Sequence, residues 1–407
     1  MSNNWLARCL QDSELFYLRQ DLTLNFLVKV GNSHFLWRVR DDTIQLNDSF
    51  TIGDVWSFTL VIPAEAWVKF TSKNPPPFHN TLQAMIAHVS GVYVEGDRLA
   101  WAQSVTAVER ICVLARGEVN HAPYTSPREF VPETIQGHYV KTATSDGECI
   151  LYYEEAGSGH PIIFLHTAGS DSRQYKYLLG NRELQKYWHM YAVDMPYHGR
   201  SEPPNGWWTK PYRLTTKMYS DWIVSFMKAV GLHDKHPIIS GSSMGGAIVL
   251  YLAAEYGDLF KAVISIEGGF GTRGRYVTWT NHPKVHGGKF LQSWVAGLMA
   301  PNSPEYDRRL TLWEYSQGAP GVYQGDTYFY SQDWPEVSDS IGKTKCPLWI
   351  LTGEYDYSCT PEMSKQAAER MGGQFIEMKS IGHFPMSENP EVFTEYLTSV
   401  LNDVSKL

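Results

Sequence analysis

The chain has 407 residues, of which 43% are hydrophobic and 19% charged, a composition typical of a globular protein long enough for two domains. Its formal net charge of −8, with no long basic run, argues against nucleic acid or an anionic membrane as a partner. Aromatic residues make up 14% of the chain, and rings at this density line pockets and interfaces as well as cores.

The cysteines and the N-terminus indicate the compartment. The five cysteines show no pairing rhythm and no C-x-x-C motif, so the sequence predicts neither a disulfide framework nor a zinc site. The first residues lack the basic and apolar regions of a signal peptide, and no run of about 18 apolar residues occurs. We therefore expect a cytoplasmic protein that does not bind a membrane.

Residues 1–118 predict a small α+β domain, because strand signals come first and helical periodicity follows. Short runs rich in Val, Phe, Thr and Trp between Gly, Asn and Asp predict strands at 22–30, 35–39, 43–46 and 56–62. Apolar residues at helical spacing predict helices near 63–70, 82–89 and 99–114.

The order of these elements resembles the sterol-carrier-protein-like fold. The resemblance rests on Asp-Asp-Thr-Ile at 41–44, Ala-Trp at 66–67 and Gly-Val-Tyr-Val-Glu-Gly-Asp at 91–97. It implies an apolar tunnel or a dimerisation surface, so a homodimer is one expected assembly. A docking module without a ligand of its own is the alternative.

A polar, proline-bearing stretch at 119–136 predicts a linker, and a second domain is expected from 137 to 407. In that domain, continuous apolar runs alternate with helical segments, which indicates a mostly parallel sheet covered on both faces. The expected buried strands are 161–165, 191–194, 238–240, 262–266 and 348–351. Functional groups should then follow the carboxyl ends of the strands.

The third of these strands leads into Gly-Ser-Ser-Met-Gly-Gly at 241–246, a G-x-S-x-G pattern with Ser243 at its centre. Glycines are needed on either side because the serine sits on a strained turn between strand and helix. The helix that follows aims free N–H groups at the same point, where they can stabilise an oxyanion. Ser243 is therefore the candidate nucleophile.

Two further loops carry the groups that a serine nucleophile requires. Asp356 follows the last expected strand in a Gly-Glu-Tyr-Asp turn, and His383 lies in a Gly-His-Phe-Pro loop before the final helix. A histidine must take the serine's proton, and a carboxylate must fix the tautomer of that histidine. The chain order Ser, Asp, His thus predicts a catalytic triad. The alternative acid is Glu267, which follows the strand at 262–266.

From about residue 137 to 407 the sequence resembles the α/β-hydrolase family. The Ser243 turn, called the nucleophile elbow, and the loops that carry Asp356 and His383 match this family in order and spacing. The segment Asp-Met-Pro-Tyr-His-Gly-Arg-Ser at 194–201 is also similar to the family's D-x-P-G-x-G-x-S segment, with Tyr197 in place of its first glycine. The resemblance implies an oxyanion hole made by the N–H groups of Met244 and Ala168. In this chain Thr167 follows His166 where the family usually has glycine, so the Thr167 hydroxyl is a further candidate donor.

An insertion at about 268–343 is rich in aromatic residues and is expected to form a lid over the triad. We predict an apolar or aromatic small-molecule substrate and substrate-binding roles for His166, Trp279, Trp294 and Trp313. His282 and His286 stand four residues apart, but no third ligand follows at a recognisable spacing, so no metal site is predicted.

The expected reaction is hydrolysis of a carboxylic ester or lactone by a serine hydrolase that needs no cofactor. A serine at the elbow argues against the aspartate-dependent dehalogenase and epoxide hydrolase chemistries of this scaffold. Hydrolysis of a C–C bond in aromatic ring-cleavage products is the second expectation, and amide hydrolysis is the third. A ligand-binding receptor that keeps the pocket without catalysis is the alternative from another class.

Overall fold

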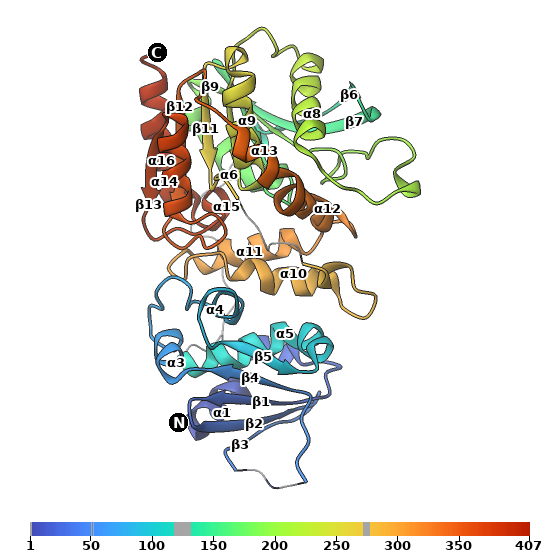
Figure 1. The fold of residues 1–407 in the computed structure, drawn as a ribbon, viewed down its shortest axis with the longest axis vertical. Helices are drawn as coiled ribbons and strands as arrows, with labels where there is room; N and C mark the ends of the chain where they lie inside the picture. Colours follow the sequence, from blue (N-terminus) through green and yellow to red (C-terminus); the bar gives the residue numbers. More distant parts are fainter. Residues whose placement is uncertain (1, 50, 52, 118–131, 272–276) are drawn as a thin grey trace. The chain divides into compact units, whose positions relative to one another are not determined.

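A computed structural model of the chain describes residues 2–49, 51, 53–117, 132–271 and 277–407 (Figure 1). The chain forms two compact units. The first comprises Met1–Thr125 with Asn281–Asn302, and the second comprises Ser126–Thr280 with Ser303–Leu407. Most of the expected linker, residues 119–131, and residues 272–276 of the expected lid lie outside the described residues.

The first unit is built on a five-stranded mixed sheet in the order β3-β2-β1-β4-β5. Its strands are β1 Leu24–Val30, β2 Ser33–Val39, β3 Ile44–Asn47, β4 Phe58–Ile62 and β5 Tyr93–Gly96. Its helices are α1 Ser2–Gln11, α2 Ser13–Leu18, α3 Ala64–Phe70, α4 Leu82–His88, α5 Arg98–Val113 and α10 Gly287–Ala296. The α+β class predicted for this part of the chain is confirmed, whereas its likeness to sterol-carrier-protein-like domains stays a prediction.

Aromatic side chains form the core of this unit. Trp5 of α1 packs edge-on against Trp37 of β2 with ring centroids 4.8 Å apart, and Trp101 of α5 packs against Phe58 of β4 at 5.6 Å. Figure 1 shows α5 lying along the sheet beside β5. The buried Asp12 carboxylate accepts a hydrogen bond from the Arg110 guanidinium at 3.0 Å, which joins the N-terminal helices to α5.

Residues 281–302 belong to this first unit although they come from the aromatic insertion at 268–343. Helix α10 packs on α5, and its side chains Phe290, Leu291 and Val295 are buried. The side-chain amide of Asn80 donates to the carbonyl oxygens of Gly297 at 3.0 Å and Met299 at 2.8 Å. The expected lid is therefore divided between the two units.

The second unit contains an eight-stranded sheet in the order β13-β12-β11-β10-β8-β9-β7-β6. Its strands are β6 Gln136–Thr144, β7 Gly147–Gly157, β8 His160–Leu165, β9 Trp188–Val193, β10 Ile238–Ser242, β11 Ala262–Ile266, β12 Leu348–Gly353 and β13 Gln374–Met378. Strands β8 to β13 pair in parallel, and β6 and β7 add an antiparallel edge. The predicted mostly parallel α/β sheet is confirmed.

Helices cover both faces of this sheet. The larger helices of the whole second unit are α8 Thr216–Ala229, α9 Met244–Glu255, α11 Glu305–Tyr315, α14 Pro361–Met371 and α16 Pro390–Val404. Short ones are α6 Lys176–Leu179, α7 Arg182–Gln185, α12 Val322–Tyr328, α13 Trp334–Ser340 and α15 Pro385–Glu388. One face packs against α6, α7 and α16, while α9 contacts β10 and β11, and α14 lies beside β12 and β13 (Figure 1).

Helix α9 is apolar on all sides and approaches the strands closely at two glycines. A Cβ atom at Gly246 would lie 2.3 Å from the Ile266 carbonyl oxygen, and one at Gly245 would lie 2.6 Å from the Leu165 carbonyl oxygen. The Met-Gly-Gly sequence after Ser243 therefore serves packing as well as the turn.

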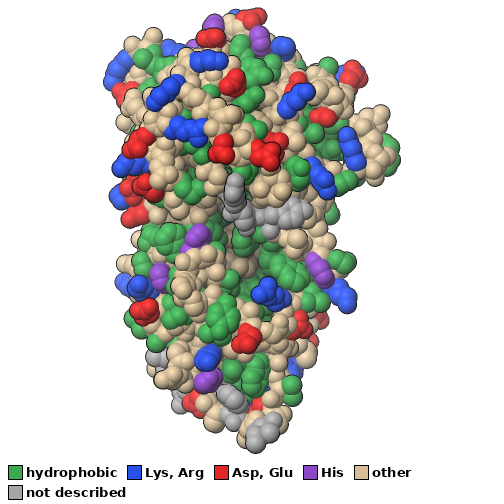
Figure 2. Space-filling view, viewed as in Figure 1, with side chains coloured by type: hydrophobic (Ala, Val, Ile, Leu, Met, Phe, Trp, Pro, Cys, Tyr) green, Lys and Arg blue, Asp and Glu red, His purple; other side chains and the backbone are tan. Residues whose placement is uncertain are grey.

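The surface charges, the cysteines and the lengths of the helices bear on the expectations from composition. On the face drawn in Figure 2, acidic and basic side chains are interspersed. All five cysteines are free thiols, and four of them are buried. Within the described ranges, no helix is both long enough and apolar enough to cross a bilayer.

We expect a chain shortened to residues 132–407 to expose the apolar face of α10, because α5 would be missing. Burial of a large apolar side chain contributes about 1.5–3 kcal/mol, and α10 buries three of them on this side. Light scattering and limited proteolysis of the shortened and full chains test this. Association of the shortened chain and cleavage within 281–302 are the expected results, whereas unchanged mass and unchanged resistance would contradict them.

Candidate active site

Ser243 stands at the turn between β10 and α9 in a strained backbone conformation, with φ 57° and ψ −109°. Such a positive φ is rare for a residue with a side chain and persists only where the surroundings enforce it. Here the Ser243 N–H donates to the Ile266 carbonyl of β11 at 2.8 Å, and the side chain is 3% exposed. The strained turn holds the hydroxyl beyond the end of the strand.

His383 reaches Ser243 from the loop between β13 and α15. Its Nε2 lies 2.6 Å from the Ser243 Oγ, and its Nδ1 lies 2.6 Å from an oxygen of Asp356. The Glu388 carboxylate holds this loop, accepting from the N–H of Gly382 at 2.5 Å and from the Ser303 hydroxyl at 3.0 Å. The structure thus brings the three residues predicted as the triad into one hydrogen-bonded line.

Asp356 follows β12, and its two oxygens have separate tasks. Oδ2 faces His383, while Oδ1 accepts the N–H groups of Ser358 at 2.7 Å and Cys359 at 3.2 Å. A carboxylate fixed in this way accepts from the imidazole Nδ1–H and so leaves Nε2 free to accept the serine proton.

Glu267, the alternative acid, is fully buried beside this pair, after β11. Its carboxyl oxygens accept the N–H of Gly353 at 2.9 and 3.2 Å. Burial, and then the neighbouring Asp356 carboxylate, raise the pKa of Glu267 well above its ordinary value. This shift favours the protonated form of Glu267, and the direct partner of His383 is Asp356.

In the described part of the chain, a cluster with donor atoms close enough for a metal consists of Glu267, Asp356 and His383. Both nitrogens of His383 already serve the triad, so we assign the cluster to proton transfer. His282 and His286 have structural roles, since the Nδ1 atoms accept the N–H groups of Lys284 and Lys289 within their own turns.

The expected oxyanion hole lies where α9 begins and where the loop after β8 ends. Met244 and Ala168 are both buried, and the N–H of Met244 is among the first of α9, which have no partner within the helix. Thr167 is engaged elsewhere: its N–H donates to the Gln174 side chain at 3.0 Å, and its hydroxyl contacts Gln174 and the Tyr315 hydroxyl. The Thr167 hydroxyl is thus bound within the protein, and its part in the oxyanion hole stays a prediction.

His166, predicted to bind substrate, is hydrogen-bonded to the protein through both ring nitrogens. Its side chain is fully buried, its Nδ1–H donates to the Thr167 carbonyl at 2.8 Å, and its Nε2 accepts the Met195 N–H at 3.2 Å. Burial, and then neighbouring His198, lower the pKa of His166 to about 4. The neutral imidazole of His166, with both nitrogens hydrogen-bonded, joins the loop after β8, which we call the oxyanion loop, to the segment after β9.

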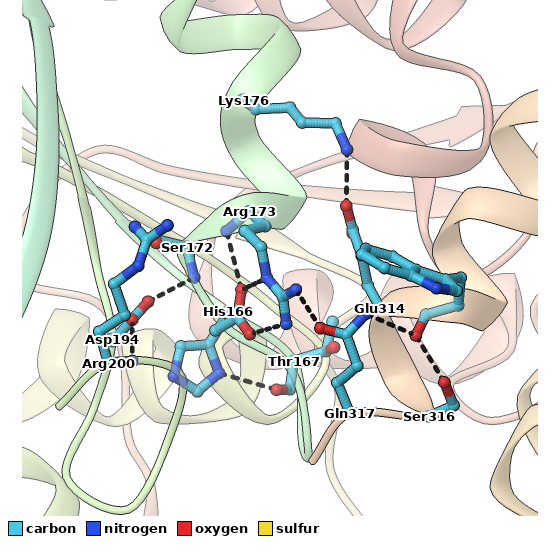
Figure 3. A network of polar contacts seen from close by, with 12 residues as sticks. His166, Thr167, Ser172, Arg173, Lys176, Asp194, Arg200, Glu314, Ser316 and Gln317 are labelled. Atoms are coloured by element: carbon cyan, nitrogen blue, oxygen red, sulfur yellow. Dashed lines mark hydrogen bonds and ion pairs between the residues drawn. The ribbon is translucent and has the colours of Figure 1, made fainter. Parts of the chain in front are cut away.

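A polar network supports the oxyanion loop from the side of residues 171–176 (Figure 3). The Arg173 guanidinium pairs with Asp171 and donates to the Gln317 side chain at 2.7 Å. Asp194 accepts the N–H groups of Ser172 at 2.7 Å and Arg200 at 2.8 Å. A polar cavity of about 290 Å³ borders this network, and Ser243 is not part of its wall.

Asp326 of α12 ties the oxyanion loop to the insertion. Its Oδ2 accepts the Gly169 N–H at 2.7 Å and the His198 Nε2–H at 2.8 Å, and its Oδ1 accepts the Tyr212 hydroxyl at 2.7 Å. Burial alone lowers the pKa of His198, but the Asp326 carboxylate outweighs it, so the pKa of His198 lies above its ordinary value of 6.5.

The three tryptophans predicted to bind substrate lie on three separate elements. Trp313 of α11 is 56% exposed, and Trp294 lies on α10 in the first unit. Trp279 is partly buried in the 3-10 turn Trp279–Asn281. The sequence shows that these residues are aromatic, but it does not show which way their side chains face.

Tyr330 also contacts the candidate nucleophile, and the sequence does not predict it as a site residue. Its hydroxyl lies 2.9 Å from the Ser243 Oγ, and its side chain is 3% exposed. It stands in a π-helical turn, Phe329–Asp333, between α12 and α13. Such turns are frequent at functional sites. The sequence shows only a run of aromatic residues here.

A model of the alpha/beta hydrolase family matches residues 162–396, more than half of the chain, and it spans the elbow, Asp356 and His383. The chain belongs to the α/β-hydrolase family. The match begins at residue 162, so the first 125 residues, which form most of the first unit, lie outside it.

Individual relatives of this α/β-hydrolase are distant. It is 22% identical over 246 residues to the (E)-2-((N-methylformamido)methylene)succinate hydrolase of Acinetobacter baylyi, covering 56% of this chain and 85% of that protein. Its fold is similar to that of a thermophilic esterase from Thermogutta terrifontis, with TM-score 0.56, 21% identity and coverage of 66% and 99% of the two chains. For the enol-lactonase from Burkholderia xenovorans LB400 the TM-score is 0.53, the identity 19% and the coverage 64% and 99%.

We expect Asp356→Asn to reduce kcat on the order of 10⁴-fold, because the amide no longer fixes the imidazole tautomer. Glu267→Gln should cost less than about tenfold, because a neutral amide still offers an acceptor to Gly353 and a donor toward Asp356. Steady-state kinetics of both variants, with thermal melts as the fold control, test this. The reverse order would make Glu267 the acid of the triad.

The His198–Asp326 pair predicts a pH dependence of stability. Because the pKa of His198 is raised in the folded state, its contribution is complete below about pH 6.5 and is lost as pH rises through the folded-state value. Urea unfolding of the protein and of His198→Gln at pH 6 and pH 9 should show a larger loss for the unsubstituted chain. Equal losses would show that the pair is not ionised.

Proposed function

We propose that this α/β-hydrolase cleaves a carboxylic ester or lactone through a covalent acyl-enzyme on Ser243. The observation that carries the proposal is the line of two 2.6 Å contacts, from Ser243 Oγ to His383 Nε2 and from His383 Nδ1 to Asp356. This geometry gives the serine a base and gives the base its orienting carboxylate.

The reaction has two halves. In the first, His383 Nε2 takes the proton of Ser243 as the Oγ attacks the carbonyl carbon, and the N–H groups of Met244 and Ala168 stabilise the oxyanion. The imidazolium then protonates the leaving oxygen, and the acyl group stays on Ser243. In the second half, His383 activates water to hydrolyse the acyl-enzyme. Asp356 stays ionised throughout and stabilises the imidazolium.

Two observations support this bond type and an apolar or aromatic acyl group. The solved structures with the same fold include an esterase and an enol-lactonase. Aromatic rings also surround the triad: Phe384 lies 5.0 Å from the His383 ring and 5.1 Å from that of Tyr315, and Phe329 lies 5.6 Å from Tyr330. An apolar substrate loses little on entering such surroundings.

Amide hydrolysis is a second candidate, because the name of the Acinetobacter relative gives its substrate a formamido group. The same triad performs it if the leaving nitrogen is protonated. Hydrolysis of a C–C bond stays a prediction from the sequence.

The five free cysteine thiols also fit the reducing compartment that the sequence predicts.

A burst of p-nitrophenol from p-nitrophenyl butyrate, with an amplitude of about one per chain, is the expected result for an acyl-enzyme. Ser243→Ala should abolish the burst and turnover, because only the hydroxyl is lost. His383→Ala should be nearly as severe, and the double variant hardly worse. A ligand-binding receptor would release no chromophore, and a burst that persists in Ser243→Ala would exclude this nucleophile.

A further inference from the structure

The hydroxyl of Tyr330 lies at the nucleophile, where the proposed reaction has not yet used it. Among the described residues, Ser243 Oγ contacts His383 Nε2 at 2.6 Å and Tyr330 Oη at 2.9 Å. Both side chains are almost fully buried, so water does not shield the Tyr330 hydroxyl from the reacting atoms.

The protons on this line have a defined order. The Asp356 carboxylate is an acceptor, so the His383 proton sits on Nδ1, and Nε2 must accept from the Ser243 hydroxyl. The Ser243 hydroxyl thus donates to His383, and its remaining lone pairs accept from the Tyr330 O–H. Tyr330 is therefore a hydrogen-bond donor aimed at the nucleophilic oxygen.

The segment that carries Tyr330 is fixed on both sides. Four residues before it, Asp326 accepts the Gly169 N–H of the oxyanion loop at 2.7 Å. Three residues after it, Asp333 accepts the N–H of Thr216 at 2.6 Å and its hydroxyl at 2.5 Å, at the start of α8. The indole N–H of Trp334 donates to the Gly269 carbonyl at 3.0 Å. The hydroxyl is thus carried by the turn that directly follows α12, the helix whose Asp326 binds the loop after β8.

We infer that Tyr330 is a catalytic residue, the third hydrogen-bond donor to the oxyanion, and this rests on the proposed acyl transfer at Ser243. When the Oγ bonds to carbon, its lone pair is used and its basicity falls. Negative charge then appears on the carbonyl oxygen, roughly 2.3 Å from the Oγ by ordinary covalent geometry. Since a charged acceptor forms the stronger bond, the Tyr330 O–H moves from the Oγ to the oxyanion.

The oxyanion has room for this donor. A tetrahedral alkoxide oxygen has three lone pairs, and the N–H groups of Met244 and Ala168 use two of them. The Thr167 hydroxyl, the other candidate on the loop, is bound by Gln174 and Tyr315. Tyr330 therefore supplies a contact that neither the elbow nor the loop after β8 provides.

The step balances without a further reactant. The Ser243 proton moves to His383 Nε2, the Oγ pair forms the bond to carbon, and the carbonyl π pair becomes the third lone pair of the oxyanion. When that pair returns, the bond to the leaving group breaks and the leaving atom takes the proton from His383. Tyr330 keeps its proton throughout and changes only its acceptor.

Tyr330→Phe removes the hydroxyl and keeps the ring that packs on Phe329. Tyr328→Phe is the matched control, because its ring lies against the Arg213 guanidinium and belongs to neither the triad nor the oxyanion site. The first readout is the second-order rate of Ser243 labelling by a fluorophosphonate, which builds negative charge on a phosphoryl oxygen and does not depend on the natural substrate. The second is kcat and KM for a p-nitrophenyl ester and for the matching ethyl ester.

We expect Tyr330→Phe to lower the labelling rate and kcat on the order of 10²-fold, as for loss of one oxyanion donor, with KM nearly unchanged and similar losses for both esters. Tyr328→Phe should stay within about twofold, because it removes no donor from the site. A loss that grows with the basicity of the leaving group would assign Tyr330 to leaving-group protonation and overturn the inference. Unchanged rates, or a loss matched by a lowered melting temperature, would also overturn it.

Failure of the proposed function looks different. A chain that is labelled at Ser243 but hydrolyses neither ester would refute the proposed substrate class, while the labelling rates would still decide the role of Tyr330. A chain that hydrolyses esters at the same rate with Phe at position 330 would refute only the role of Tyr330.

Discussion

The chemistry of this protein depends on how closely helix α9 approaches the strands beside it. A side chain at Gly245 or Gly246 would meet the backbone of β8 or the carbonyl end of β11, so only glycine lets the helix start where it does. That start fixes Ser243 in its strained conformation and fixes the first N–H groups of α9. The positions of the proposed nucleophile and of half of its proposed oxyanion hole thus follow from one packing contact.

Buried carboxylates then set the other loops against this fixed point. Asp356 orients His383, Glu388 holds the N–H of Gly382 next to that histidine, and Asp326 holds the N–H of Gly169 next to Ala168. Each takes a backbone N–H or a ring N–H that would otherwise be buried without a partner, which costs about 1–3 kcal/mol. The same bonds that stabilise the loops therefore position the reacting groups.

The sequence predicts the part of the site that is local to strand ends. Ser243, Asp356 and His383 each follow a strand or its turn within a few residues, and parallel strands end at one edge of a sheet. The contact of Tyr330 with Ser243 spans 87 residues and depends on a π-helical turn, which no apolar periodicity indicates. Trp313 shows the same limit, because the sequence identifies it only as an aromatic residue of the insertion, and in the fold its ring is 56% exposed.

The sequence also does not show which unit residues 281–302 pack against. Residues 281–302 follow the hydrolase strands in the chain, so sequence order places them in the lid. Their apolar face is buried on α5, almost 200 residues earlier, and a pattern of apolar residues does not identify which element covers it. The partner of these apolar residues is therefore known only from the fold.

Backbone strain connects these observations. Among the described residues, seven other than glycine have positive φ, and four of them follow parallel strands of the hydrolase sheet: Tyr197 after β9, Ser243 after β10, Glu267 after β11 and Ser380 after β13. Each such residue costs on the order of 1–3 kcal/mol, so the edge that carries the triad stores more strain than the rest of the sheet.

Tyr197 shows how the cost of a strained backbone is offset. It has φ 76°, and its ring stacks on that of Tyr212 with centroids 4.2 Å apart, while the Tyr212 hydroxyl donates to Asp326. The carboxylate that holds the oxyanion loop thus also stabilises a strained turn, and the geometry of the site and the stability of the fold rest on the same buried group.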